Sequence, residues 1–226
     1  MTTTPSTILR DLVLRWNQSF SLVSRQDPRA QTESLIHECC VSGAVLVEEL
    51  ASSLGDSKLH YLDLGTGGGF PGLLWHQAIE SNEALAANYH GSTLVEPRSK
   101  RAWFLDQAVR AMGLDGVLVL EDSWSPSMVP SVNLFDAGCV VISMKALHLT
   151  DAQVLEGWDA FHGGGDHQRI VIVRFIADWS HPADSGIDDL PVTPLSCIQW
   201  DRGPGYLVLP YASSRPDSVL LLSVYP

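Results

Sequence analysis

The chain has 226 residues, of which 45% are hydrophobic and 18% are charged. This composition is typical of a folded globular protein and excludes a largely disordered chain or a collagen. No apolar run approaches the ~18 residues of a membrane-spanning helix, and the polar start of the chain predicts no secretory signal. Four cysteines without a C-x-x-C pair favour reduced thiols. We therefore expect a cytoplasmic protein without a membrane partner.

The net charge of −12 is unevenly distributed along the chain. Residues 1–113 carry nine Lys and Arg against twelve Asp and Glu, whereas residues 114–226 carry five against fourteen. A nucleic-acid binder is usually basic over its contact face, so we expect such a face only in the first half. Its candidate residues are Arg10, Arg15, Arg25, Arg29, Arg98, Lys100, Arg101 and Arg110.

The apolar periodicity changes after residue 55. Helical spacing over residues 7–54, with a turn at 24–28, predicts an N-terminal helical cap. Beyond it we predict strands and helices in alternation: strands 59–64, 92–96, 117–120, 139–143 and 170–176, a helix from about 71, helices 99–112 and 151–161, and a hairpin of strands 206–209 and 219–225. This order predicts a doubly wound, mostly parallel α/β sheet with an antiparallel C-terminal hairpin. We divide the chain into a cap, 1–57, and an α/β domain, 58–226, that form one structural unit.

A glycine-rich loop follows the first predicted strand, in the sequence Asp-Leu-Gly-Thr-Gly-Gly-Gly-Phe-Pro-Gly over residues 63–72. Because glycine has no side chain, a ligand can approach the backbone of this loop at the carboxyl edge of the sheet. Residues 67–72 satisfy the dinucleotide fingerprint G-x-G-x-x-G. The other frame, an acid and then alternate glycines, is the motif of class I S-adenosylmethionine (SAM) methyltransferases, which are Rossmann-like; it comprises Asp63, Gly65, Gly67 and Gly69. The acid and the preceding helices favour SAM over NAD, while Glu96, at the end of the second strand, suits the ribose hydroxyls of either cofactor.

The glycine loop also resembles one particular family. Its ending Phe70-Pro71-Gly72, Trp16-Asn17 upstream, and Glu96 followed by Lys100-Arg101 are similar to motifs of the RsmG (GidB) family over residues 9–147. These are 16S rRNA guanine-N7 methyltransferases. The resemblance implies a class I fold, SAM as cofactor, and 16S rRNA or the small ribosomal subunit as partner. It also implies cofactor contacts at Trp124 and Ser125, where the family tends to have an acidic pair, and Phe70 either flanks the cofactor or packs beneath the first helix.

The catalytic candidate is Lys145. The family's Ser-Arg-Ala-Phe after the fourth strand is replaced by Ser-Met-Lys-Ala-Leu at 143–147, so Lys145 is either the arginine's substitute, touching a base or phosphate, or a solvated lysine. Guanine N7 has a free lone pair and needs no general base, so catalysis is mainly positioning.

The histidines show no metal spacing, and we expect no metal. Two alternatives stay open: a SAM-dependent methyltransferase of a small molecule or protein, favoured by the charge and the changed motif, and a SAM-binding protein without catalysis.

Overall fold

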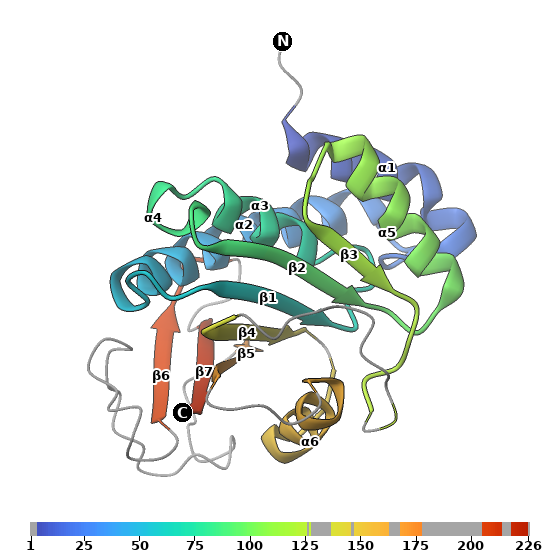
Figure 1. Cartoon of the computed structure of the whole chain (residues 1–226). Helices are drawn as coiled ribbons and strands as arrows, with labels where there is room; N and C mark the ends of the chain where they lie inside the picture. Colours follow the sequence, from blue (N-terminus) through green and yellow to red (C-terminus); the bar gives the residue numbers. More distant parts are fainter. Residues whose placement is uncertain are drawn as a thin grey trace.

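The computed structural model describes residues 4–125, 127, 137–145, 147–162, 168–177, 205–213 and 218–225. Within these residues one seven-stranded sheet forms the centre of the molecule (Figure 1), with the strand order β3-β2-β1-β4-β5-β7-β6. The strands are β1 (Leu59–Leu64), β2 (Tyr89–Val95), β3 (Val117–Leu120), β4 (Cys139–Met144), β5 (Arg169–Ile176), β6 (Gly205–Pro210) and β7 (Val219–Tyr225).

The helices are α1 (Pro5–Phe20), α2 (Pro28–Ser53), α3 (Gly72–Glu80), α4 (Glu83–Ala86), α5 (Ser99–Met112) and α6 (Asp151–His162). Local residues set the ends of the first two. The hydroxyl of Thr4 accepts from the backbone N–H of Thr7 at the start of α1, and Asp27 accepts from that of Ala30, at 3.0 Å, at the start of α2. A proline follows each cap, where no N–H is needed. The short helix α4, capped by Asn82, was not among the sequence predictions.

Strand pairing confirms the predicted doubly wound α/β fold. Strands β1 to β5 pair in parallel, whereas β7 is antiparallel to both β5 and β6. The chain therefore enters the sheet at β1, winds outward to β3, and returns to β4 on the other side of β1. The carboxyl ends of β1 and β4 meet where this direction reverses, and an open parallel sheet binds its ligands at such a point.

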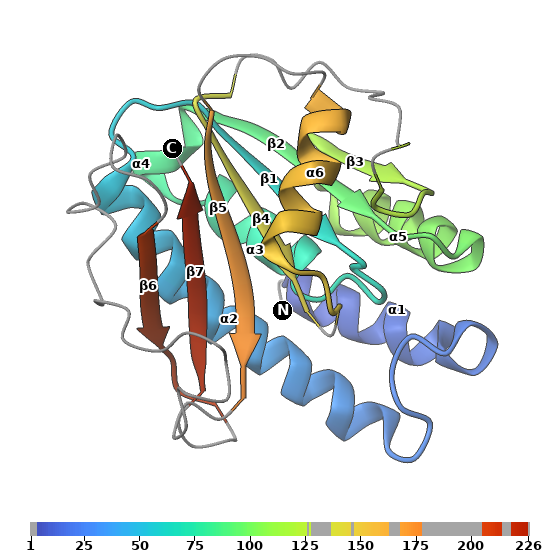
Figure 2. The same ribbon diagram turned by 90° about the horizontal axis from the view of Figure 1, so that it is seen from below.

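Helices cover both faces of the sheet, as Figure 2 shows. On one face, Leu46 and Leu50 of α2 and Trp75 of α3 pack against β1, β4, β5 and β7; α1 and α5 extend this layer over β2. On the other face, α6 packs its Trp158 and Phe161 against β1, β4 and β5. Every residue of β1 and β4 is buried, as expected of parallel strands that are covered on both faces.

The N-terminal helices pack directly on the α/β layers. Helix α1 lies against α5, and α2 lies against α3. The division of the chain at residues 57 and 58 stays a prediction. No helix in the described part of the chain is both long enough and apolar enough to cross a membrane.

Candidate active site

The glycine loop connects β1 to α3 at the carboxyl edge of the sheet. Two of its glycines are required by geometry. Gly69 has a φ of +87°, and a Cβ there would lie 2.5 Å from the side chain of Leu73. Gly67 has a φ of +58°, a conformation that costs energy for any residue with a side chain. The loop therefore keeps bare backbone at the place where the sequence predicts a cofactor.

Asp63, the acid of the motif, lies beneath this loop and is fully buried. It accepts hydrogen bonds from the hydroxyl of Ser143 at 2.5 Å and from the backbone N–H of Gly72 at 3.0 Å. Burial raises its pKa to about 6, against the lowering effect of these hydrogen bonds. The carboxyl group thus ties the end of the glycine loop to β4, and it is not among the residues that line the adjacent cleft.

Glu96 follows β2 and is 2% exposed. One carboxylate oxygen accepts from the backbone N–H of Gly67 at 2.9 Å, and the other accepts from that of Arg98 at 3.0 Å. A carboxylate has about four acceptor positions, so Glu96 keeps about two for a ligand. The contact with Gly67 joins the two sequence motifs, which are 29 residues apart.

A cleft of about 310 Å³ opens between the glycine loop and the residues that follow β2 and β4. Its lining brings together four of the predicted site residues: Gly65, Glu96, Trp124 and Lys145. The other lining residues are Val95, Pro97, Arg98, Arg101, Ser123, Leu147 and Leu149. A larger cavity, of about 430 Å³, lies between α1 and α2. We assign the active site to the smaller one because the motifs of three strand ends converge there.

Five predicted cofactor residues lie outside this lining: Asp63, Gly67, Gly69, Phe70 and Ser125. Phe70 is 7% exposed and packs in the apolar cluster with Leu22 and Leu73, which is the second of the two positions anticipated for it. Ser125 hydrogen-bonds through its hydroxyl to Ser127, and its neighbour Ser123 lines the cleft instead. Periodicity alone does not show which residue of a loop turns inward.

Arg101 lines the cleft, whereas we predicted from the sequence that it would lie on a basic face that contacts RNA. Its guanidinium donates to the backbone carbonyl of Ser21, at 2.5 Å, in the turn after α1. A Cβ on Gly67 would lie 3.6 Å from the same guanidinium. Burial lowers the pKa of Arg101, followed by the nearby positive charge of Arg98. Arg101 therefore lies between the turn after α1 and the glycine loop, whereas Arg98 and Lys100 are exposed. The sequence could have indicated the place of Arg101 at the cleft, because Arg101 lies three residues after Arg98 and Arg98 closely follows Glu96.

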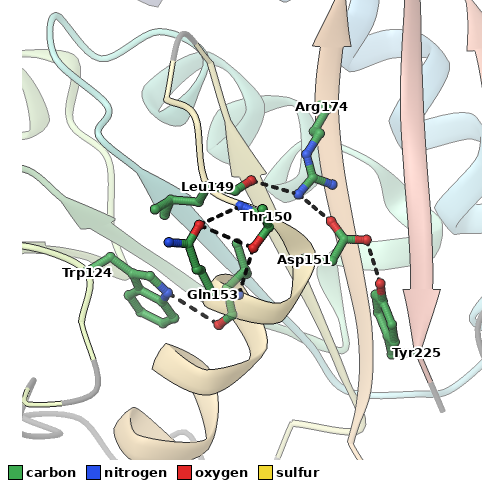
Figure 3. Close-up of polar contacts among 8 residues, drawn as sticks. Trp124, Leu149, Thr150, Asp151, Gln153, Arg174 and Tyr225 are labelled. Atoms are coloured by element: carbon green, nitrogen blue, oxygen red, sulfur yellow. Dashed lines mark hydrogen bonds and ion pairs between the residues drawn. The ribbon is translucent and has the colours of Figure 1, made fainter. Parts of the chain in front are cut away.

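The N-terminus of α6 holds the Leu149 side of the cleft in place (Figure 3). Arg174 of β5 pairs with Asp151 and donates to the carbonyl of Leu149 at 3.1 Å. Tyr225 of β7 donates to Asp151 at 2.5 Å. This network binds the helix start to two strands and so positions Leu149.

Trp124 is anchored to the same helix. Its ring N–H donates to the carbonyl of Val154 at 3.3 Å. A Cβ on Gly157 would lie 2.3 Å from that nitrogen, so the glycine makes room for the indole. Trp124 is partly buried and lines the cleft.

Lys145 comes directly after β4 and lines the cleft. Its ammonium forms an ion pair with Glu38 of α2 and lies 4.4 Å from the centre of the Phe175 ring. It is therefore a held cation rather than a solvated one. No group of three or more potential metal ligands occurs among the described residues.

An open α/β sheet with a glycine loop after β1 and a buried carboxylate after β2 has the architecture of the class I SAM-dependent methyltransferases. A solved SAM-dependent methyltransferase from Leishmania major shares this fold, with a TM-score of 0.50 and 15% identity, over 96% of this chain and 82% of that one. The family described as GidB, rRNA small subunit methyltransferase G, matches residues 6–126. The chain belongs to this family, which confirms the resemblance seen in the motifs.

Two relatives show how far the similarity extends. Ribosomal RNA small subunit methyltransferase G of Paracidovorax citrulli is 30% identical over 205 residues, which cover 84% of this chain and 78% of the relative. The protein of the same name from Xylella fastidiosa strain M23 is 32% identical over 111 residues, or 49% of this chain. That match spans 43% of the relative's length, less than half.

Proposed function

We propose that this protein transfers a methyl group from SAM to N7 of a guanine in 16S rRNA, in the small ribosomal subunit. The observation that carries the proposal is the cleft itself, which brings Gly65 and Glu96 of the family's cofactor motifs together with Lys145. Family membership supports rRNA as the substrate class. A cytoplasmic location, expected from the sequence, is part of the proposal.

The cleft residues fit SAM. Glu96 has about two free acceptor positions for the two ribose hydroxyls, and the bare backbone at Gly65 and Gly67 leaves room for the methionine part. Asp63 supports the loop from below, and Trp124 offers an aromatic surface. When bound, SAM supplies a methyl group activated on a sulfonium.

The chemistry asks little of the protein beyond placement. Guanine N7 carries a lone pair that is not protonated at neutral pH, so no proton has to be removed before methylation. Holding the two reactants in line provides much of the rate, because a bimolecular step becomes effectively unimolecular. Asp63 is buried below the loop, and this proposal gives it no role as a base.

Basic residues at the cleft and between α1 and α2 support an RNA partner despite the net charge. Arg98 and Lys100 are exposed at the start of α5, next to the cleft. Arg25 and Arg29 line the larger cavity between α1 and α2, and they also belong to the first half of the sequence. Arg10 and Arg29 each have an acidic neighbour, Asp11 and Glu33, which reduces their value for phosphate binding.

One observation favours a small molecule or a protein as the methyl acceptor. The net charge of −12 repels a polyanion at long range. An RNA enzyme with this charge needs a local basic rim, for which the exposed Arg98, Lys100 and Arg25 are candidates.

Methyl transfer from tritiated SAM to isolated small ribosomal subunits tests the proposal, followed by mass spectrometry of the 16S rRNA nucleosides. We expect 7-methylguanosine in the rRNA of the treated subunits. It should be absent from untreated subunits of a strain that lacks the gene. The Glu96→Gln variant, whose SAM binding should be weaker, is the matched control and should label the rRNA more slowly at the same SAM concentration. Labelling of small molecules or proteins but not rRNA would favour the alternative acceptor. SAM binding without any transfer would favour a protein that binds SAM but does not catalyse.

A further inference from the structure

Lys145 is held in place by two side chains from separate parts of the chain. Its ammonium pairs with the carboxylate of Glu38 in α2, 107 residues earlier. It also lies over the ring of Phe175 in β5, at 4.4 Å from the ring centre. A cation close to the face of an aromatic ring is attracted to it. The side chain of Lys145 is only 17% exposed, and its residue lines the cleft.

Glu38 is itself fixed. Its second carboxylate oxygen accepts a hydrogen bond from Tyr211, at 3.1 Å, just after β6. Burial raises the pKa of Tyr211, and the charge of Glu38 raises it further, so the phenol stays protonated and remains a donor. Lys145 has three N–H donors. Glu38 takes one, which leaves two for an acceptor in the cleft.

We propose that Glu38 is a positioning residue: it holds the ammonium of Lys145 so that this cation donates a hydrogen bond to O6 of the guanine whose N7 is methylated. The proposal rests on the function proposed above. O6 and N7 are both acceptors on the same edge of guanine, whereas adenine has a donor amino group at position 6. A fixed N–H donor therefore fits guanine and repels adenine, while N7 remains free for the methyl group.

The fixed position of the Lys145 ammonium affects the reaction rate as well as the choice of base. Methylation at N7 places positive charge on the ring, which a cation at O6 does not stabilise, so Lys145 contributes to the rate by orienting N7 toward the methyl group. Misplacing a reactant by about 1 Å can lower the rate ~10²-fold. A lysine that is free to rotate keeps its charge but loses this orientation. Loss of Glu38 should therefore lower kcat less than loss of Lys145.

The test is a double-mutant cycle on methyl transfer to small ribosomal subunits, with Glu38→Gln, Lys145→Met and the double variant. The control is Glu33→Gln, the same change on an exposed face of α2, where Glu33 pairs with Arg29. We expect kcat to fall ~10²-fold for Lys145→Met, from lost orientation of the base, and about tenfold for Glu38→Gln. The double variant should match Lys145→Met within about twofold, because Glu38 acts through Lys145. The SAM affinity of Glu38→Gln should stay that of the wild type, whereas its melting temperature should fall because Lys145 loses its ion pair.

A second measurement tests the contact with O6. Transcripts of 16S rRNA containing 6-thioguanosine, assembled into subunits, replace this oxygen with sulfur, a weaker acceptor. The wild type should methylate them about tenfold more slowly than normal subunits, and Lys145→Met should treat both alike. An effect of the sulfur on RNA folding would slow both enzymes equally.

The outcomes separate the two proposals. A wild type that labels no rRNA refutes the proposed function. A wild type that forms 7-methylguanosine while Glu38→Gln keeps full kcat refutes the positioning role. Effects that multiply in the double variant refute it too, since the two side chains would then act independently. Equal slowing of both enzymes by 6-thioguanosine refutes the contact with O6.

Discussion

Replacing Glu96 by Gln removes one negative charge from the cleft and changes the shape of the side chain little. In the wild type, both carboxylate oxygens accept from backbone N–H groups, those of Gly67 and Arg98. The amide of Gln has a single oxygen, so its NH₂ group faces one of these donors. The substitution thus perturbs the ribose contact and the glycine loop together.

The expected magnitude follows from these contacts. Loss of a charge-assisted hydrogen bond from a ribose hydroxyl weakens SAM binding by ~1.5–3 kcal/mol, which is about 10- to 150-fold in Kd. One buried N–H left without an acceptor costs a further ~1–3 kcal/mol of folding free energy. For a chain of this size, each kcal/mol lowers the melting temperature by about 2–4 °C.

Isothermal calorimetry with SAM and with S-adenosylhomocysteine measures the first effect, and thermal unfolding measures the second. Glu48→Gln, at an exposed position of α2, removes the same charge far from the glycine loop in sequence and should change neither. A folded Glu96→Gln variant whose SAM affinity lies within twofold of the wild type would refute the assignment of the ribose to Glu96.

Three further predictions concern the loop, the RNA contact and pH. Gly67→Val forces a branched side chain into a φ of +58° beside Arg101, so calorimetry should show at least tenfold weaker SAM binding; unchanged binding would place the cofactor elsewhere. Lys100→Ala should weaken binding to 16S rRNA and reduce the log–log salt slope by about 0.7, while SAM affinity stays constant; an unchanged slope excludes a phosphate contact. Asp63 has its pKa raised from 3.8 to about 6, so the folded state retains a proton that the unfolded state loses. Stability should therefore fall as pH rises from 3.8 to 6, by at most ~3 kcal/mol, and urea titrations should show this slope removed in Asp63→Asn.

Local sequence patterns determined most of the secondary structure and the position of the cofactor motifs. The strand 59–64, the helix 99–112 and the strand 219–225 have the predicted bounds, because apolar periodicity, caps and turn residues act over a few neighbours. The glycine loop and Glu96 were identified for the same reason. A loop that must present its backbone shows this need in its own residues.

Tertiary packing decided which side chains face the cleft. The burial of Phe70, the turn of Ser123 toward the cleft in place of Ser125, and the inward position of Arg101 depend on elements that pack from elsewhere in the chain. The pairing of Lys145 with Glu38 joins residues 107 positions apart. No local pattern encodes such a contact, because it exists only once α2 has packed against the sheet and brought its face to the end of β4.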